Sequence, residues 1–525
     1  MGRTFVWTAL VCCVSARSAF AQTQDVQQLQ DRIQQLEQIT HELKDRLAAL
    51  EKSQPGAPHA ANTLSTAGSQ ASEGQPGVPH VVNAVYTTGS QTTASLAQPQ
   101  SFGTVDGKAA AASRLGDASP PAAQPNGTAL LARPQDAPPQ PEPPEEKVAK
   151  PEMEVYGKAQ LDFGYDANQI DPNWFDVLRT TKLPSFPNQF GHNGNIFASV
   201  RQTRFGARNL FPTPLGQLKT VFEFELFGVG IDAGQTTFRL RHAYGELGQF
   251  LAGQTWSPFM DPDVFPNSVE YWGPPGMVFF RNLQFRWQPI NNGNKQVMIA
   301  LERPGASADL GSIVDRDIIQ GVKFRFPAPD VSGRVRYGGE RTYIQLAGIF
   351  RYIKWDDNAP TATTNLSSHT YGWGVNASSN VGVGPKDTIK MSFIYGHGVE
   401  NYMNDAPVDV APKVTTNPHK PIDGDALPVI GVVAFYDHYW NDKFSSTLGY
   451  SLIDIRNAAL QLPDAFHRGH YALTDLLYYP VKNVMIGGEY IYGHRTNFSD
   501  GFGVNDNRIQ FTFSYNFSYK IGGAQ

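Results

Sequence analysis

The sequence predicts an all-β transmembrane barrel of about 16 antiparallel strands, preceded by an N-terminal coiled-coil helix and a disordered linker. Three observations lead to this fold class. Apolar and polar side chains alternate repeatedly between residues 153 and 519, short and long connections alternate between these runs, and a heptad repeat with a Pro-rich stretch precedes them. The chain therefore divides into four segments, which are residues 1–21, 22–52, 53–151 and 152–525.

The first segment has the pattern of a secretory signal peptide. Arg3 precedes a short apolar run, and Ala19-Phe20-Ala21 forms a small-x-small cleavage site. A lipoprotein anchor at Cys13 is the weaker interpretation, because the residue before it is neither Gly nor Ala. Both cysteines of the chain would leave with the signal. The mature protein would then have no disulfide, no thiolate metal site and no Cys nucleophile.

Residues 22–52 carry a heptad repeat. One seam consists of Val26, Ile33, Thr40 and Leu47. A second seam, offset by three residues, consists of Leu29, Leu36, Leu43 and Leu50. Four heptads meet the usual threshold for a coiled coil. The repeat favours association between chains without fixing their number, and a lone amphipathic helix is the alternative.

Residues 53–151 have the composition of a disordered linker. Pro, Ala, Gly, Ser, Thr and Gln dominate, and such a segment cannot bury enough apolar surface to become ordered. The run from Gln54 to His59 returns in similar form from Gln75 to His80. We interpret this duplication as slippage in an unconstrained spacer rather than as a binding repeat.

Residues 152–525 are predicted to form the barrel, because their side chains alternate with a period of two. Between Glu154 and Tyr165, odd-numbered residues are apolar or small and most even-numbered ones are polar. No stretch outside the signal approaches the roughly 20 apolar residues of a membrane helix. The expected strands are 153–165, 196–208, 217–227, 236–246, 249–256, 277–288, 295–303, 320–337 (interrupted at Pro327), 342–355, 368–381, 386–396, 428–440, 443–455, 466–479, 484–495 and 504–519.

The connections between these strands alternate in length. The short ones belong on the periplasmic side and the long ones outside, as in outer-membrane barrels. With this assignment both ends of the barrel face the periplasm, where the coiled coil would also lie. The long connections include 166–195, 257–276, 356–367 and 397–427.

Strand parity assigns the charged side chains of the early strands to the lumen. A Lys or Arg that faces mid-bilayer lipid costs about 2–4 kcal/mol, so charges opposite an apolar face should point inward. The predicted pore-lining basic residues are Lys158, Arg204, Arg208, Lys219, Arg239, Arg241, Arg281 and Arg286. Arg241 is a special case because a bulge is possible within residues 239–243. Guanidinium groups bind carboxylates through two prongs, which indicates a wall that guides anions. The alternative is salt bridging to Glu223, Glu225 and Asp162.

The connection at residues 257–276 is a candidate constriction loop. It is long, contains several prolines, and carries Asp261, Asp263 and Glu270 together with aromatic residues. If it folds inward, it narrows the pore and places these acids across from the basic wall, where a transverse field would orient charged solutes. An ordinary external loop is the alternative.

Composition and motifs argue against other functions. The net charge of −5 excludes a generally basic, nucleic-acid-binding surface. No G-x-S-x-G or H-E-x-x-H motif occurs, so we expect no enzyme, no catalytic residue, no metal and no cofactor. A sugar-preferring or non-selective pore remains an alternative because aromatics are abundant. A second alternative is a structural protein that ties the outer membrane to the cell wall through its coiled coil.

The arrangement resembles the DcaP-like porins, within the general architecture of bacterial porins. The resemblance is carried by the heptad segment, the Pro/Ala spacer and three motifs: Glu154-Val155-Tyr156-Gly157, Gln202-Thr203-Arg204-Phe205-Gly206 and Gly253-Gln254-Thr255-Trp256-Ser257. It implies a homotrimeric outer-membrane porin with a periplasmic coiled coil, a third loop folded into the lumen, and passive diffusion of small anionic solutes such as dicarboxylates. One departure is that the chain continues past Phe517 and Tyr519 to Gln525, whereas such barrels often end on an aromatic residue.

Overall fold

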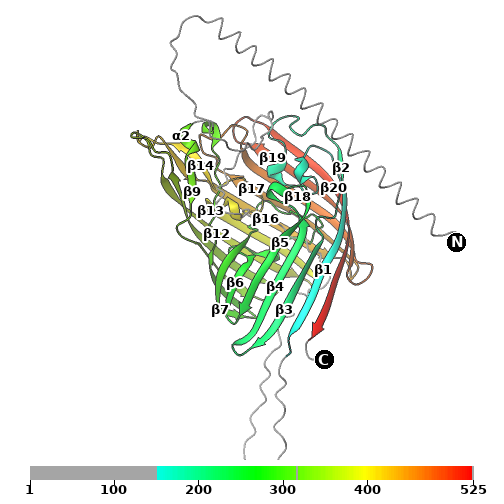
Figure 1. Cartoon of the computed structure of the whole chain (residues 1–525). Coiled ribbons are helices and arrows are strands. Elements are labelled where there is room, and N and C mark those ends of the chain that lie inside the picture. Colours follow the sequence, from blue (N-terminus) through cyan, green and yellow to red (C-terminus); the bar gives the residue numbers. More distant parts are fainter. Residues whose placement is uncertain (1–149, 315–316, 523–525) are drawn as a thin grey trace, which may run out of the picture. The chain divides into compact units, whose positions relative to one another are not determined.

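The structure is a computed structural model that describes residues 150–314 and 317–522. The described residues form a closed antiparallel barrel (Figure 1). The predicted signal peptide, coiled coil and almost all of the linker lie outside the described residues. In this part of the chain no helix is long and apolar enough to span a membrane.

The described wall contains sixteen strands, because two of them are each built from two shorter pieces that pair with the same neighbour. Their bounds are β1 Glu152–Asp166, β2 Asn195–Ser199 with β3 Arg204–Thr213, β4 Gly216–Phe227, β5 Thr236–Leu247, β6 Phe250–Trp256, β7 Arg281–Asn292, β8 Lys295–Glu302, β9 Val322–Arg325 with β10 Asp330–Gly338, β11 Tyr343–Asp357, β12 Ser368–Val383, β13 Asp387–His397, β16 Pro428–Tyr439, β17 Phe444–Ile455, β18 Phe466–Tyr478, β19 Val484–Asn497 and β20 Gly503–Gly522. The predicted strand count is confirmed.

The first and last strands close the barrel. Glu152 of β1 pairs with Gly522 of β20, and the register continues without a break to Asp166 and Arg508. Every pairing in the wall is antiparallel, and the pairing of β1 with β20 closes the sheet, as a membrane-spanning β-structure requires.

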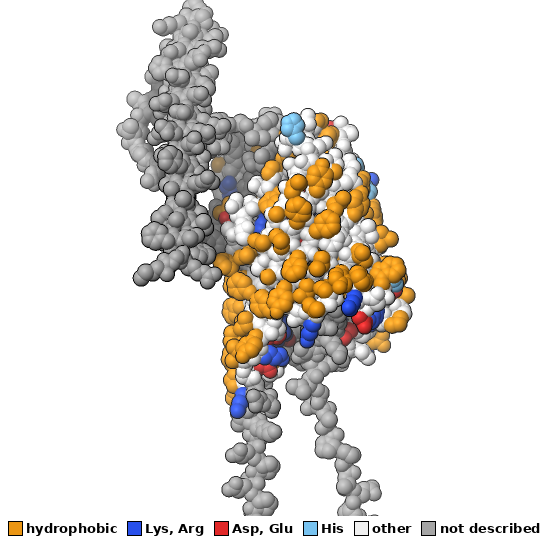
Figure 2. All heavy atoms as spheres, turned by 90° about the vertical axis from the view of Figure 1, so that its right-hand side faces the viewer, with side chains coloured by type: hydrophobic (Ala, Val, Ile, Leu, Met, Phe, Trp, Pro, Cys, Tyr) orange, Lys and Arg blue, Asp and Glu red, His pale blue; other side chains and the backbone are white. Residues whose placement is uncertain are grey.

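The side chains alternate as the sequence predicts. On β1, Leu161, Phe163 and Tyr165 are about half exposed on the outward face, while Gln160 and Asp162 are buried inside. Figure 2 shows apolar side chains spread over the outward face, with charged side chains gathered near the short-turn end. The outward surface is thus suited to hydrocarbon and the interior to polar groups.

Long loops enter the barrel from one end. We call residues 257–280 the inward loop; nearly all of these residues are buried within the lumen. Their apolar side chains, including Phe259 and Met277, pack with residues from β11, β13, β16 and β17 in one hydrophobic cluster. The expectation that this loop folds inward is confirmed. Met277 to Phe280, which we expected to begin a strand, instead belong to the loop.

Three smaller elements lie in the long connections. They are the helix α2 Asp317–Gln320 and the hairpin formed by β14 Val410–Val414 and β15 Ile422–Ala426. Short 3-10 turns occupy Pro172–Trp174, Thr180–Lys182, Gly230–Asp232, Pro262–Val264, Gly311–Ile313 and Glu400–Tyr402.

Candidate functional site

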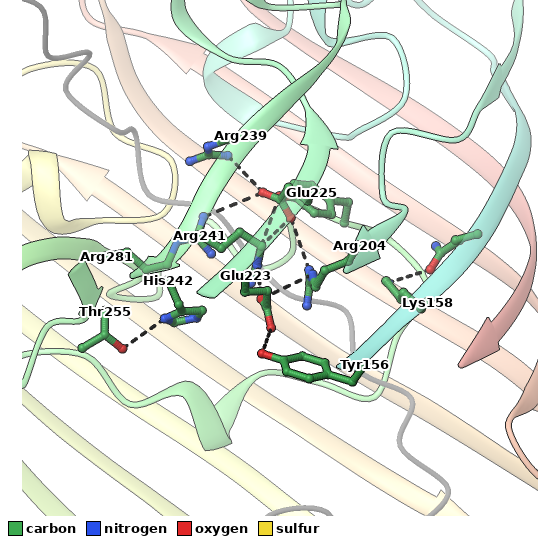
Figure 3. Close-up of polar contacts among 12 residues, drawn as sticks. Tyr156, Lys158, Arg204, Glu223, Glu225, Arg239, Arg241, His242, Thr255 and Arg281 are labelled. Carbon is green, nitrogen blue, oxygen red and sulfur yellow. Dashed lines mark hydrogen bonds and ion pairs between the residues drawn. The ribbon is translucent and has the colours of Figure 1, made fainter. Parts of the chain in front are cut away.

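Two carboxylates on β4 lie at the centre of a group of arginines inside the barrel (Figure 3). Glu223 and Glu225 are separated by one residue, so both point inward, and both are buried. The guanidinium groups around them come from β3, β5 and β7. We call the four residues Arg204, Arg239, Arg241 and Arg281 the arginine cluster.

Distances in the arginine cluster show direct ion pairing. Arg241 Nε lies 2.6 Å from Glu223 Oε1, and Arg204 Nη2 lies 3.3 Å from Glu225 Oε2. Arg239 Nη1 is 3.5 Å and Arg281 Nη2 is 3.9 Å from Glu225 Oε1. The salt bridges weighed as an alternative are therefore present for the two glutamates. Asp162, the third acid of that alternative, accepts hydrogen bonds from Gln160 and Thr512 instead.

An extra residue in β5 places two consecutive side chains, Arg241 and His242, in the interior. Glu223 pairs with His242 and Phe224 with Leu240, so Arg241 has no partner of its own in the register. This β-bulge lets Arg241 and His242 both point inward, while Leu240 stays on the outward face. The bulge predicted in this run is confirmed. It brings His242 into the interior beside Arg239 and Arg241, which plain alternation already places there.

The arginine cluster keeps an excess of positive charge. Four guanidinium groups face two carboxylates. His242 lies beside them and shares a hydrogen bond of 3.1 Å with Thr255. Charges in a low-dielectric interior act over longer distances than in water, so the remaining positive charge extends into the neighbouring lumen.

The other predicted basic residues lie around the same wall. Lys158 is buried and donates to Gln160 over 2.6 Å. Arg208 pairs with Glu154 at 2.9 Å, and Lys219 pairs with Glu246 at 3.6 Å.

Two further arginines lack carboxylate partners among the described residues. Arg286 on β7 is inward, between the outward Phe285 and Trp287, and its Nε has no hydrogen-bond partner. Arg334 on β10 donates from Nη2 to Gln296 at 3.1 Å, but its Nε also has no partner. β8 lies between the two strands, so both side chains project from the same part of the wall.

The carboxylates of the inward loop make their contacts elsewhere. Asp263 pairs with Arg336 of β10 at 2.6 Å, and Asp261 lies 3.9 Å from the same guanidinium. Asp261 also accepts hydrogen bonds from Tyr343 and Ser378. These two acids therefore pair with β10, a strand that our predicted basic wall did not include.

Glu270, the third loop acid, is tied to backbone groups. Its Oε1 accepts a hydrogen bond of 3.0 Å from the backbone N–H of Leu178, and its Oε2 accepts one from Gly273. Tyr271 of the loop contacts the arginine cluster: its hydroxyl accepts a hydrogen bond of 3.5 Å from Arg241 Nη1 and donates one to Glu225.

Sequence reasoning missed Arg334 and Arg336. They alternate with Val335 and Tyr337, which are exposed on the outward face. The alternation of apolar and basic side chains along this strand is therefore the signal that identifies Arg334 and Arg336 as inward-facing.

Comparison with known proteins identifies the family. The model of the DcaP outer membrane protein family matches residues 147–517. The chain belongs to this family. It is therefore an outer-membrane protein with a DcaP-type barrel. No curated protein sequence matches the chain.

Comparison with solved structures gives one fold-level match. The outer membrane channel DcaP of Acinetobacter baumannii is similar with a TM-score of 0.57 at 20% sequence identity, over 70% of this chain and 97% of that chain. An anion-selective porin from Comamonas acidovorans gives a TM-score of 0.46 at 10% identity, over 70% and 99% of the two chains. OmpT of Vibrio cholerae gives 0.42 at 13% identity, over 70% and 97%. At 20% identity the likeness to the Acinetobacter baumannii channel concerns the fold alone.

Proposed function

We propose that the protein is a porin through which small anionic solutes diffuse passively, and that the basic residues of the lumen set its selectivity. The observation that carries the proposal is the pair Arg286 and Arg334, whose guanidinium groups have no carboxylate partner among the described residues. A solute that bears carboxylates would offer these groups the acceptors that the protein does not supply.

The arginine cluster supports the same proposal. Its excess positive charge lies on β3, β5 and β7. An anion near Arg286 would therefore be attracted both by Arg286 and Arg334 and by the arginine cluster. A solute with two carboxylates, such as a small dicarboxylate, could contact two guanidinium groups at once.

The experiment is a reversal-potential measurement in planar bilayers under a salt gradient. The double variant Arg286→Gln with Arg334→Gln should shift the reversal potential toward that of a non-selective pore. Arg208→Gln is a matched control, because Arg208 is already paired with Glu154. An unchanged selectivity in the double variant would overturn the assignment, and block by saccharides with weak selectivity would favour a sugar channel instead.

We also propose the assembly that the N-terminal sequence suggests. Residues 22–52 would form a periplasmic coiled coil after removal of residues 1–21, and three chains would associate. Cross-linking of the mature protein in the outer membrane tests the stoichiometry. Deletion of residues 22–150 distinguishes envelope anchoring by the coiled coil from conduction by the barrel. Envelope anchoring would weaken, while the single-channel conductance would stay the same.

A further inference from the structure

An apolar groove lies on the outward surface of the barrel, near the end with the long loops. Its volume is about 570 Å³, and its lining includes Leu283, Phe285, Leu301 and Phe326. All four side chains are between 37% and 52% exposed. Pro327, in the segment that joins β9 to β10, contributes to the same lining.

The apolar side chains of the groove face away from the lumen, although Gln284 and Glu302 also contribute to its lining. Leu283 and Phe285 alternate along β7 with the buried Gln284, and Leu301 of β8 precedes the buried Glu302. Because successive side chains of a strand point to opposite faces, the apolar groups of the groove face the hydrocarbon side.

Basic side chains lie at the end of this groove. Arg303 continues the outward face of β8 after Leu301, and its backbone N–H donates to the carbonyl of Leu283. Lys323 and Arg325 are exposed on β9, where Arg325 pairs in register with Lys354 of β11. The registers of β8, β10, β11 and β9 place Arg303 and Lys323 one strand and about four residues apart, or about 14 Å between backbone positions.

The positive charge at this rim is only partly neutralised. Asp356 is shared between Arg325, at 3.5 Å, and Lys354, at 3.2 Å. Lys323 lies opposite Asp356 in the register but forms no ion pair with it, and Arg303 has no carboxylate partner within the described part of the chain. On the outward rim of β17 and β18, by contrast, Arg468 is paired with Asp454.

We propose that the groove holds an acyl chain of an outer-leaflet lipid whose phosphate headgroup contacts Arg303 and Lys323. An arginine on the lipid face costs about 2–4 kcal/mol at the bilayer midplane but roughly 0–1 kcal/mol near the interface, so Arg303 belongs at headgroup depth. The apolar lining and the basic rim then match the two parts of one amphipathic anion. A free phosphate would leave the apolar lining unused, and a lipid with a neutral headgroup would leave the cations unused.

Native mass spectrometry of the full chain in detergent tests this site. Lipid A, which carries several acyl chains and phosphates, and phosphatidylcholine serve as probes. We expect the wild-type protein to bind lipid A at least tenfold more tightly than phosphatidylcholine. Arg303→Gln with Lys323→Gln should reduce lipid A binding at least tenfold, and Leu301→Trp, which fills the groove, should do the same. Arg468→Gln should leave binding unchanged.

Several results would overturn the proposal. Equal retention of both lipids, or an unaffected double variant, would mean that the lipid is ordinary annular lipid. Loss of binding in the double variant but not in Leu301→Trp would mean surface attraction without a groove. A change in oligomeric mass in Leu301→Trp would assign the groove to a second copy of the chain. Heat-modified migration on gels verifies that each variant is folded.

Discussion

The hydroxyl of Tyr271 donates a hydrogen bond to Glu225, and this contact joins the inward loop to the arginine cluster. Both residues are fully buried. The ring of Tyr271 also stacks on Phe227 with centroids 4.1 Å apart. One residue of the loop is thus fixed by a polar and an aromatic contact to the same strand.

Removal of that hydroxyl should loosen the loop. Tyr271→Phe keeps the stacking on Phe227 but deprives a buried carboxylate of one donor, which costs about 1–3 kcal/mol. We expect a lower urea midpoint of unfolding and more current noise in single-channel records. Tyr519→Phe, on the outward face, is the control. Identical noise and stability in Tyr271→Phe would show that the contact does not hold the loop.

Neutralisation of Glu225 should have a larger effect. Glu225 lies within ion-pair distance of all four members of the arginine cluster, and uncompensated buried charges typically cost 3–5 kcal/mol. Glu225→Gln should therefore destabilise the barrel by about 3–5 kcal/mol. In the fraction that folds, anion selectivity should increase, because the lumen gains one net positive charge. Reversal potentials measure the second effect, and a shift toward cations would contradict our account of the cluster.

Arg336 should hold the first part of the inward loop. It pairs with Asp263 and lies over the ring of Tyr343, 3.4 Å from its centroid. Arg336→Gln leaves Asp261 and Asp263 without their cation, so we expect the pore to become more permeable to cations. The control is Arg325→Gln, which removes an exposed arginine from the outward face. Equal selectivity in the two variants would argue that the acids do not face the conducting path.

Glu489 should clamp the far part of the same loop. Its two carboxylate oxygens accept hydrogen bonds from the adjacent backbone N–H groups of Val269 and Glu270, at 3.0 and 3.2 Å. A glutamine offers one acceptor oxygen instead of two, so Glu489→Gln should release one N–H. We expect faster proteolysis at residues 265–275 in the folded barrel, detected by mass spectrometry. A cleavage rate equal to that of the wild type would mean that the other loop contacts suffice.

Much of the wall could be predicted from sequence because the physical signal is local. Lipid and water on opposite sides impose a period of two, and this identified the sixteen strands of the wall, including the interruption at Pro327, but not the hairpin of β14 and β15. The run from Met277 to Phe280 was misassigned because an apolar segment buried in the lumen has the same composition as a lipid-facing strand.

The contacts of the inward loop with the wall could not be predicted in this way. Asn267 contacts Asp437 and Tyr479, which are 170 and 212 residues away in the chain. Such contacts depend on how far each loop reaches across the barrel, which alternation does not encode. The pairing of Asp261 and Asp263 with Arg336 follows from the path of the loop.

The bulge in β5 gives Arg241 an unusual genetic property. Since this residue is supernumerary in the register, excising its codon would leave Leu240 outside and His242 inside. The same excision at Arg239 would invert the orientation of the residues on one side of the gap. A three-nucleotide deletion of this codon would therefore remove one cation from the lumen without reversing the orientation of the neighbouring residues of β5.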